Sequence, residues 1–315
     1  YTGGGCPHIL AEPERTNLIT YSIPDNANWI YYGNTTITEN YAIAPDGTNK
    51  ASRITTTTGF GTGLFFQFSA PSTDDYTFTF YAKNNGGDAD IYMVFLEPTP
   101  QSTKQITLTN EWQRFEFTRT SISSGTTIKV GVDNITSFDM LLWGAQVEEG
   151  SYPTSYIPTS GGTVTRNQDI FTRDGIGSLI NSTEGVLFAE IAALADDLTY
   201  RTITISDNTN TNNNRVLIQL SNTTNKIIGL IGSGGSTQAI FISTSYNTLE
   251  SNKIAITWKL NEFKMFINGD KIGEDNLGLT PVGLSCLDFD SALAGDIFFG
   301  KVKQLQVYDT ALTDN

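Results

Sequence analysis

Histidine and cysteine are scarce in this chain, which has one histidine and two cysteines among 315 residues. A Ser-His-Asp triad, a histidine-based zinc site or a Cys-His pair would each have to be built on His8, in a glycine-rich lead-in. We interpret His8 as a surface residue near a flexible chain end. Cys6 and Cys286 have no metal-ligand spacing around them, and we expect both to be free thiols, as in a reducing compartment. Paired carboxylates therefore remain the only serious basis for catalysis.

Basic residues are also few, with 19 Lys and Arg against 33 Asp and Glu and a formal net charge of −14. Lysine and arginine make most contacts to phosphates, so nucleic acid and anionic membrane surfaces are disfavoured as partners. The sequence lacks any run of about 18 apolar residues that would span a bilayer. No nucleic acid and no membrane are expected as partners.

The charged fraction is only 17%, while Thr, Asn, Gly, Ser and aromatic residues are abundant. This balance is typical of short strands joined by polar turns. Apolar and polar side chains alternate in residues 76–82 and in residues 112–118. We predict that a turn at 84–88 joins the strand at 76–82 to a second strand at 91–96 in a hairpin. The length exceeds what one core usually supports. We predict an all-β fold of two β-sandwich (jelly-roll) domains in tandem, residues 1–160 with an N-terminal linker and residues 161–315.

Residues 141–159 (LLWGAQVEEGSYPTSYIPT) contain an apolar, alternating strand followed by a proline-rich segment. Pro153 and Pro158 each lack a backbone donor and cannot lie inside a sheet. We therefore expect the chain to leave the first domain here on a stiff, extended tether.

This stretch, together with residues 11–22 and the loop 44–51, resembles the jelly-roll, carbohydrate-binding-type modules of bacteriophage tail, fibre and head-decoration proteins. The resemblance covers residues 11–159. Residues 252–258, 262–271 and 298–312 resemble the strands of concanavalin-A-like, laminin-G-like sandwiches, and Asn268-Gly269 suits the tight hairpin expected between two of these strands. That fold hosts lectins, glycosidases and passive spacers, so it implies architecture more than function.

Sugar binding needs an exposed aromatic face and polar side chains that bond hydroxyl groups. An aromatic-bearing loop at 23–32 and the loops near 200 and 212 supply both. The candidate residues are Trp29, Tyr31, Tyr32 and Asn28, with Tyr200, Arg201 and Asn212 in the second domain. The alternative for Trp29 is packing in the core, which is expected for Trp112, Trp143 and Trp258.

No cofactor is required by this interpretation, but the jelly-roll resemblance implies that a structural calcium ion is possible. Its candidate ligands are Asp46, Asn49 and Asp139. A plain type I turn at Asp46-Gly47 explains the loop without a metal.

The function expected on this basis is non-enzymatic: a phage virion protein, in a fibre or as decoration, that binds glycans for adhesion to a host or surface. Such a protein is assembled in the host cytoplasm and acts extracellularly, with other virion proteins as partners. The resemblance to fibres implies a homo-oligomer such as a trimer, although no coiled-coil heptads are present. The alternatives are a purely structural virion spacer, a secreted bacterial glycan-binding module, and a polysaccharide depolymerase using Asp288, Asp290 or Glu190. The Glu-x-Asp-x-x-Glu strand of the related glucanases is absent.

Overall fold

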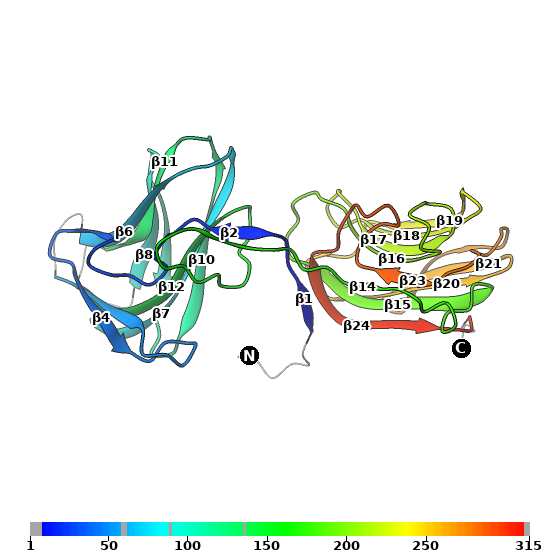
Figure 1. The fold of residues 1–315 in the computed structure, drawn as a ribbon, viewed down its shortest axis with the longest axis horizontal. Coiled ribbons are helices and arrows are strands. Elements are labelled where there is room, and N and C mark those ends of the chain that lie inside the picture. The colour runs from blue at the N-terminus through cyan, green and yellow to red at the C-terminus, as the bar shows by residue number, and fades with distance from the viewer. Residues whose placement is uncertain (1–7, 58–61, 88–89, 135–136, 312–315) are drawn as a thin grey trace. The chain divides into compact units, whose positions relative to one another are not determined.

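The computed structural model describes residues 8–57, 62–87, 90–134 and 137–311 (Figure 1). Within these ranges the regular elements are β-strands, and no helix is long and apolar enough to cross a membrane. The chain divides into two compact units: a first unit, Glu14–Asn167, and a second unit that combines Tyr1–Pro13 with Gln168–Asn315. The predicted all-β class with two sandwiches is confirmed.

The first unit packs two five-stranded antiparallel sheets face to face. In spatial order, one sheet contains β10 (Gln113–Ile122), β7 (Asp74–Gly87), β12 (Phe138–Glu149), β5 (Ala51–Thr56) and β4 (Thr36–Ala42). The other contains β3 (Ile30–Tyr32), β6 (Thr62–Ser69), β11 (Thr127–Asn134), β8 (Asp90–Glu97) and β9 (Ser102–Thr107). The expected alternation holds, because Phe78 and Phe80 of β7 point inward and pack in one core with Leu64 and Phe66 of β6.

The hairpin predicted between residues 76–82 and 91–96 is wrong. β7 and β8 belong to different sheets, so the chain crosses from one layer of the sandwich to the other between them. β7 pairs instead with β10 and β12, and β8 pairs with β11 and β9. Alternation shows which side chains face inward, but it does not show which sheet a strand joins.

The predicted tether after β12 is also wrong, because residues 151–160 fold back onto the first unit. Tyr152, Thr154, Ile157 and Thr159 are buried. Polar side chains replace the sheet partners that the prolines preclude: the Gln146 carboxamide accepts from Ile157 N (2.6 Å), and the buried Glu148 carboxylate accepts from Thr154 N (2.9 Å) and from its hydroxyl. Residues 151–160, which we call the returning segment, are therefore a structural part of the sandwich.

Asn17 joins three segments of the first unit. It is fully buried at the end of β2 (Arg15–Asn17), and its Nδ2 donates to Ala145 O (3.2 Å) and Ile157 O (2.8 Å). Its Oδ1 accepts from Ile19 N (3.0 Å) and Val147 N (3.1 Å). Four backbone groups near the opening strand, the last long strand and the returning segment therefore depend on one carboxamide.

The second unit consists of two six-stranded sheets around a core that includes Trp258. One sheet contains β1 (Ile9–Ala11), β24 (Gly300–Tyr308), β15 (Glu184–Ala193), β20 (Asn252–Lys259), β21 (Glu262–Ile267) and β22 (Asp270–Asp275). The other contains β14 (Thr172–Arg173), β23 (Cys286–Asp288), β16 (Arg201–Ser206), β17 (Arg215–Leu220), β18 (Ile227–Ser233) and β19 (Ser236–Ser243). The predicted turn at Asn268-Gly269 is present between β21 and β22, with positive φ values of 53° and 95°.

The units differ from the predicted domains 1–160 and 161–315 at both ends. β1 pairs with β24, so the described part of the N-terminal segment extends a sheet of the second unit rather than serving as a linker. β13 (Val164–Arg166) pairs with β2, which keeps residues 161–167 in the first unit. Tyr1 to Pro7, including Cys6, lie outside the described residues.

We predict that Asn17→Ala lowers the free energy of unfolding of the first unit by about 3 kcal/mol or more, because it leaves four buried backbone groups without their partner. Urea unfolding followed by tryptophan fluorescence measures this change. Asn34→Ala, at an exposed position, is the matched control and is expected to stay within about 0.5 kcal/mol of the wild type. Equal stability of the two variants would show that Asn17 does not hold the three segments together.

Candidate functional site

A cleft of about 320 Å³ with a mixed polar and apolar lining lies in the first unit, between the segment after β2 and the returning segment. Tyr21 and Tyr156 contribute aromatic rings to its lining, and Asp25, Glu39 and Lys50 contribute charged groups. The cleft therefore combines aromatic surface with hydrogen-bonding groups in a concave space, as small-molecule sites generally do.

Hydrogen bonds fix the wall that carries Tyr156. Its hydroxyl lies 2.6 Å from the hydroxyl of the buried Ser22, which also accepts from Thr159 N (3.0 Å). Burial raises the pKa of Tyr156, so the phenol stays protonated at neutral pH and keeps its hydrogen-bonding role. On the opposite wall, the Ser52 hydroxyl donates to Pro24 O (2.6 Å). These contacts preorganise the cleft.

Aromatic packing supports the Tyr156 ring from behind. Its centroid lies 4.6 Å from that of Trp143, which in turn lies 5.5 Å from the ring of Tyr81. Gly144 has a φ of +67°, and a Cβ there would lie 3.2 Å from the Tyr81 ring and 3.5 Å from the Tyr156 ring. Glycine therefore suits this position both by conformation and by space.

The rim of the cleft carries the charged groups. Glu39 accepts hydrogen bonds through Oε1 from the Asn26 backbone (3.0 Å) and side-chain amide (2.8 Å). Asp25 accepts from the backbone N–H groups of Ala27 and Asn28. Lys50 is exposed at the mouth. The remaining lone pairs of the carboxylates and the three donors of the lysine can bond hydroxyl groups of a ligand.

The sequence-based glycan candidates of the first unit do not come together in this cleft. Trp29 is only 4% exposed, its Nε1 donates to Tyr21 O (2.9 Å), and its ring packs edge-on against Phe66. The expected sugar platform at Trp29 is therefore wrong, because no face of the indole is open. Asn28 is bound to the Asp25 carboxylate, while Tyr31 and Tyr32 are exposed on β3, away from the cleft lining.

The sequence-based glycan candidates of the second unit do not form one site either. Arg201 is buried and forms a bidentate ion pair with Asp197, both contacts being 2.7 Å, so it is unavailable to a ligand. Tyr200 is exposed beside it. Asn212 lines a different pocket, where its carbonyl accepts from Arg215.

The three predicted calcium ligands do not form a site. Arg53 binds the Asp139 carboxylate through Nε (2.9 Å) and Nη2 (2.5 Å), which holds the pKa of Asp139 below its ordinary value. Asp46 instead closes its own turn by accepting from Thr48 N (2.9 Å) and Oγ1 (2.7 Å). Asn49 donates to Asn40 O. These residues do not fit a shared ion, and calcium binding elsewhere stays a prediction.

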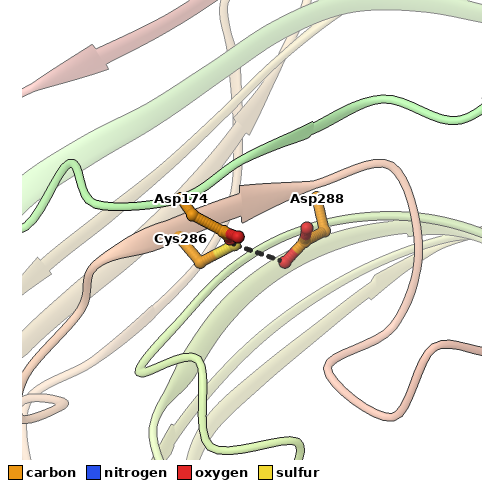
Figure 2. Close-up of side chains that lie close together, drawn as sticks. All are labelled: Asp174, Cys286 and Asp288. Atoms are coloured by element: carbon orange, nitrogen blue, oxygen red, sulfur yellow. Dashed lines mark hydrogen bonds between the residues drawn. The ribbon is translucent and has the colours of Figure 1, made fainter.

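A thiol and two carboxylates that sequence reasoning missed lie together in the second unit (Figure 2). Cys286 and Asp288 come from β23, and Asp174 follows β14, which pairs with β23. The Cys286 sulfur is 2.9 Å from Asp174 Oδ1 and 2.9 Å from Asp288 Oδ2. Within the described residues this is the group whose donor atoms could hold a metal ion, all lying within 4.8 Å of one another. Asp174 and Cys286 are far apart in sequence, so spacing alone gave no signal.

Of the three carboxylates proposed for a depolymerase, Glu190 and Asp288 do not face one another, whereas Asp290 lies close to Asp288: burial, and then the charge of Asp288, raise the pKa of Asp290 to about 6. Glu190 lies on β15 next to the inward-facing Ala189 and Ile191, so it points out of one face of the sandwich. Asp288 adjoins the inward-packed Leu287 of β23, and so points out of the opposite face. Two carboxylates on opposite faces cannot flank one glycosidic bond.

Comparison with known proteins gives no family for the chain: no family model matches it, and no curated protein matches it. Among solved structures, the CBM40 module of Ruminococcus gnavus IT-sialidase is similar with a TM-score of 0.38 and 14% identity, over 46% of this chain and 94% of that one. The tandem CBM22 modules of Paenibacillus barcinonensis Xyn10C are similar with a TM-score of 0.33 and 10% identity, over 99% of this chain and 100% of that one. Domains LG4-5 of the mouse laminin α1 chain are similar with a TM-score of 0.33 and 8% identity, over 94% of this chain and 98% of that one. TM-scores and identities this low do not assign a function.

We predict that the Cys286 thiol is unreactive in the native protein. Burial, and then the carboxylates of Asp174 and Asp288, raise the pKa of Cys286 well above its ordinary value, so the reactive thiolate is scarce even at pH 9. Because the folded state holds this proton more tightly than the unfolded state, its contribution to stability is complete below the ordinary thiol pKa and declines above it.

Labelling with a thiol-specific disulfide reagent between pH 7 and 9, with and without urea, measures this reactivity. Cys6→Ser removes the other thiol from the assay. We expect slow labelling of the native protein and fast labelling in urea. Fast native labelling that is unchanged by urea would contradict the burial and charge environment described for Cys286.

Proposed function

We propose that the chain is a non-enzymatic glycan-binding protein whose sugar ligand lies in the cleft between Tyr21 and Tyr156. The observation that carries this proposal is the preorganised cleft of about 320 Å³, in which aromatic rings and several hydrogen-bonding side chains converge. Sugars have apolar C–H faces that pack on aromatic rings and hydroxyl groups that need fixed polar partners. The cleft supplies both.

The charges at the rim favour a neutral or weakly charged sugar. Asp25 and Glu39 would repel a ligand with closely spaced carboxylates or sulfates, and Lys50 offers a single compensating charge. The net charge of −14 acts in the same direction at long range. A sugar with vicinal hydroxyl groups meets the carboxylates through charge-assisted hydrogen bonds.

The biological setting that we propose is a bacteriophage virion, with the chain in a fibre or decoration and exposed outside the host after assembly. Support comes from the residue pattern at 141–159, which resembles phage modules, and from the returning segment that this pattern builds. Glycan adhesion in this setting would involve a homo-oligomer and other virion proteins. No cofactor takes part in the proposed binding.

Absence of catalysis is part of the proposal. Glu190 and Asp288 lie on opposite faces, and Glu190 is engaged by Lys303 (3.2 Å) and Ser251 (3.0 Å). Burial alone would raise the pKa of Glu190, but these hydrogen bonds bring it below its ordinary value, so it stays ionised and is a poor general acid at neutral pH.

A glycan array probed with the full chain, followed by titration calorimetry of the best binder, tests this function. Lys50→Ala and Glu39→Ala are each expected to weaken binding by about tenfold or more, the usual effect of one lost hydrogen bond to a charged group. Tyr156→Ala should abolish measurable binding, because it removes the aromatic wall. Lys259→Ala and Glu111→Ala, at exposed positions outside the cleft, are the matched controls and should bind as the wild type does.

Two results would count against the proposal in different ways. An array without any binder would favour the structural spacer. A binder whose affinity is the same in Lys50→Ala, Glu39→Ala and Tyr156→Ala would place sugar binding elsewhere on the chain.

A further inference from the structure

A groove of about 280 Å³ crosses the outer face of one sheet in the second unit. Its floor is a row of aliphatic side chains from three neighbouring strands, because Leu217 of β17 pairs with Leu230 of β18, which pairs with Ile240 of β19. All three residues alternate with core residues and so point away from the sandwich interior, although Leu217 is only 4% exposed and Leu230 is half-buried. Ile240 is 53% exposed, an unusual position for isoleucine unless something covers it.

One wall of the groove is a tight, internally bonded turn at residues 290–297. Its ends meet where Phe298 N donates to Phe289 O (2.7 Å), and Ser291 N donates to Gly295 O (2.7 Å) across it. Thr202 N of β16 donates to Asp296 O (2.9 Å), which fixes the turn against the sheet. Leu293, 52% exposed, projects from this turn and lines the groove. The wall is therefore prebuilt, and it presents the apolar Leu293 together with Ser291 and Asp296.

Arg215 supplies a positive charge at one end of the groove. It lies two residues before Leu217 on β17 and therefore points to the same face. Asn212 accepts from its guanidinium, but no acidic side chain of the described residues pairs with it, and its buried Nε has no partner. Burial lowers the pKa of Arg215, although a guanidinium remains charged at neutral pH. The cation thus lacks a counter-ion.

The opposite end is polar and already occupied by internal contacts. Gln219 follows Arg215 by four residues, about 13 Å along an extended strand, and its Nε2 donates to Thr202 Oγ1 (2.9 Å). Asp296 lies near this end, where Gln219 also approaches its carboxylate (3.5 Å). The Asp296 carboxylate would repel an anionic group at this end, so an anionic ligand is expected to place its charge at Arg215 and its apolar body across the aliphatic row.

We propose that this groove binds a medium-chain aliphatic carboxylate, with its carboxylate on Arg215 and its hydrocarbon chain over Leu217, Leu230 and Ile240. A sugar does not fit, since no aromatic ring lines the groove and its floor offers no hydrogen bonds. The site belongs to the second unit and is independent of the glycan cleft proposed for the first.

Titration calorimetry of the full chain with decanoate, decan-1-ol, decyltrimethylammonium and butyrate tests the proposal. We expect saturable, one-to-one binding of decanoate, with decan-1-ol weaker by about tenfold for lack of the charge-assisted contact. Decyltrimethylammonium should be weaker still, because Arg215 repels it. Butyrate should not bind measurably, since each methylene lost from the apolar contact weakens binding about threefold.

Variants then test the contributions of the apolar floor and of the Arg215 charge one at a time. Ile240→Ser is expected to weaken both decanoate and decan-1-ol about tenfold, whereas Leu277→Ser, another exposed aliphatic position outside the groove, should leave both unchanged. Arg215→Gln should reduce decanoate to the affinity of decan-1-ol, and Arg173→Gln is its exposed control. Thermal unfolding confirms that each variant is folded.

Three results would overturn the proposal. The first is the failure of decanoate to saturate at concentrations up to about 1 mM. The second is binding of decan-1-ol to the wild type as tightly as decanoate, and the third is binding of decanoate to Ile240→Ser as tightly as to the wild type. Loss of glycan binding in the cleft variants would not affect any of these measurements, so the two proposals succeed or fail separately.

Discussion

The carboxamide of Asn17 is the interaction on which the first unit most depends. A sandwich whose last strand is followed by two prolines has backbone groups that no neighbouring strand can satisfy. The fully buried Asn17 side chain forms hydrogen bonds with four such backbone groups, as the donor to two carbonyls and the acceptor from two N–H groups. Gln146 and Glu148 extend the same solution along β12, so buried polar side chains replace a missing strand. The cleft exists because this returning segment is held in place beside residues 21–25.

Strand positions were predictable from the sequence because alternation is a local signal, and the observed strands β7 and β10 match the alternating stretches 76–82 and 112–118. The sheet to which each strand belongs was not predictable, since β7 and β8 each carry an inward-facing apolar row that suits either layer of the sandwich. The prediction that residues 151–160 form a tether was wrong for a related reason. Proline excludes a ladder, but it does not exclude side chains such as Asn17, which lie more than a hundred residues away, from serving as partners.

Site residues were harder to predict than strands, because the sequence shows residue types but not which face is open. Trp29 and Tyr156 both occur in polar, turn-rich surroundings, yet the Trp29 ring enters the core while the Tyr156 ring lines the cleft. The signal for Tyr156 was present in the PTSYIPT segment, where a tyrosine between two prolines had no sheet to face. Arg201 shows the converse error, since an arginine beside a loop was already paired with Asp197, four residues before it.

The two units expose different chemistry, and this difference follows from what lies outside each sheet. In the first unit the returning segment covers part of the outer surface and brings hydroxyl and phenol groups with it, so the cleft beside it combines hydrogen-bonding groups with apolar surface. In the second unit Leu217 is buried, but Leu230 is half-buried and Ile240 is 53% exposed, on the same face as an Arg215 guanidinium that has no acidic partner among the described residues. Apolar surface left in water is costly in proportion to its area, and an unpaired buried cation adds to that cost. A ligand that relieves both must be amphiphilic and anionic, whereas the cleft of the first unit gains most from a ligand rich in hydroxyl groups.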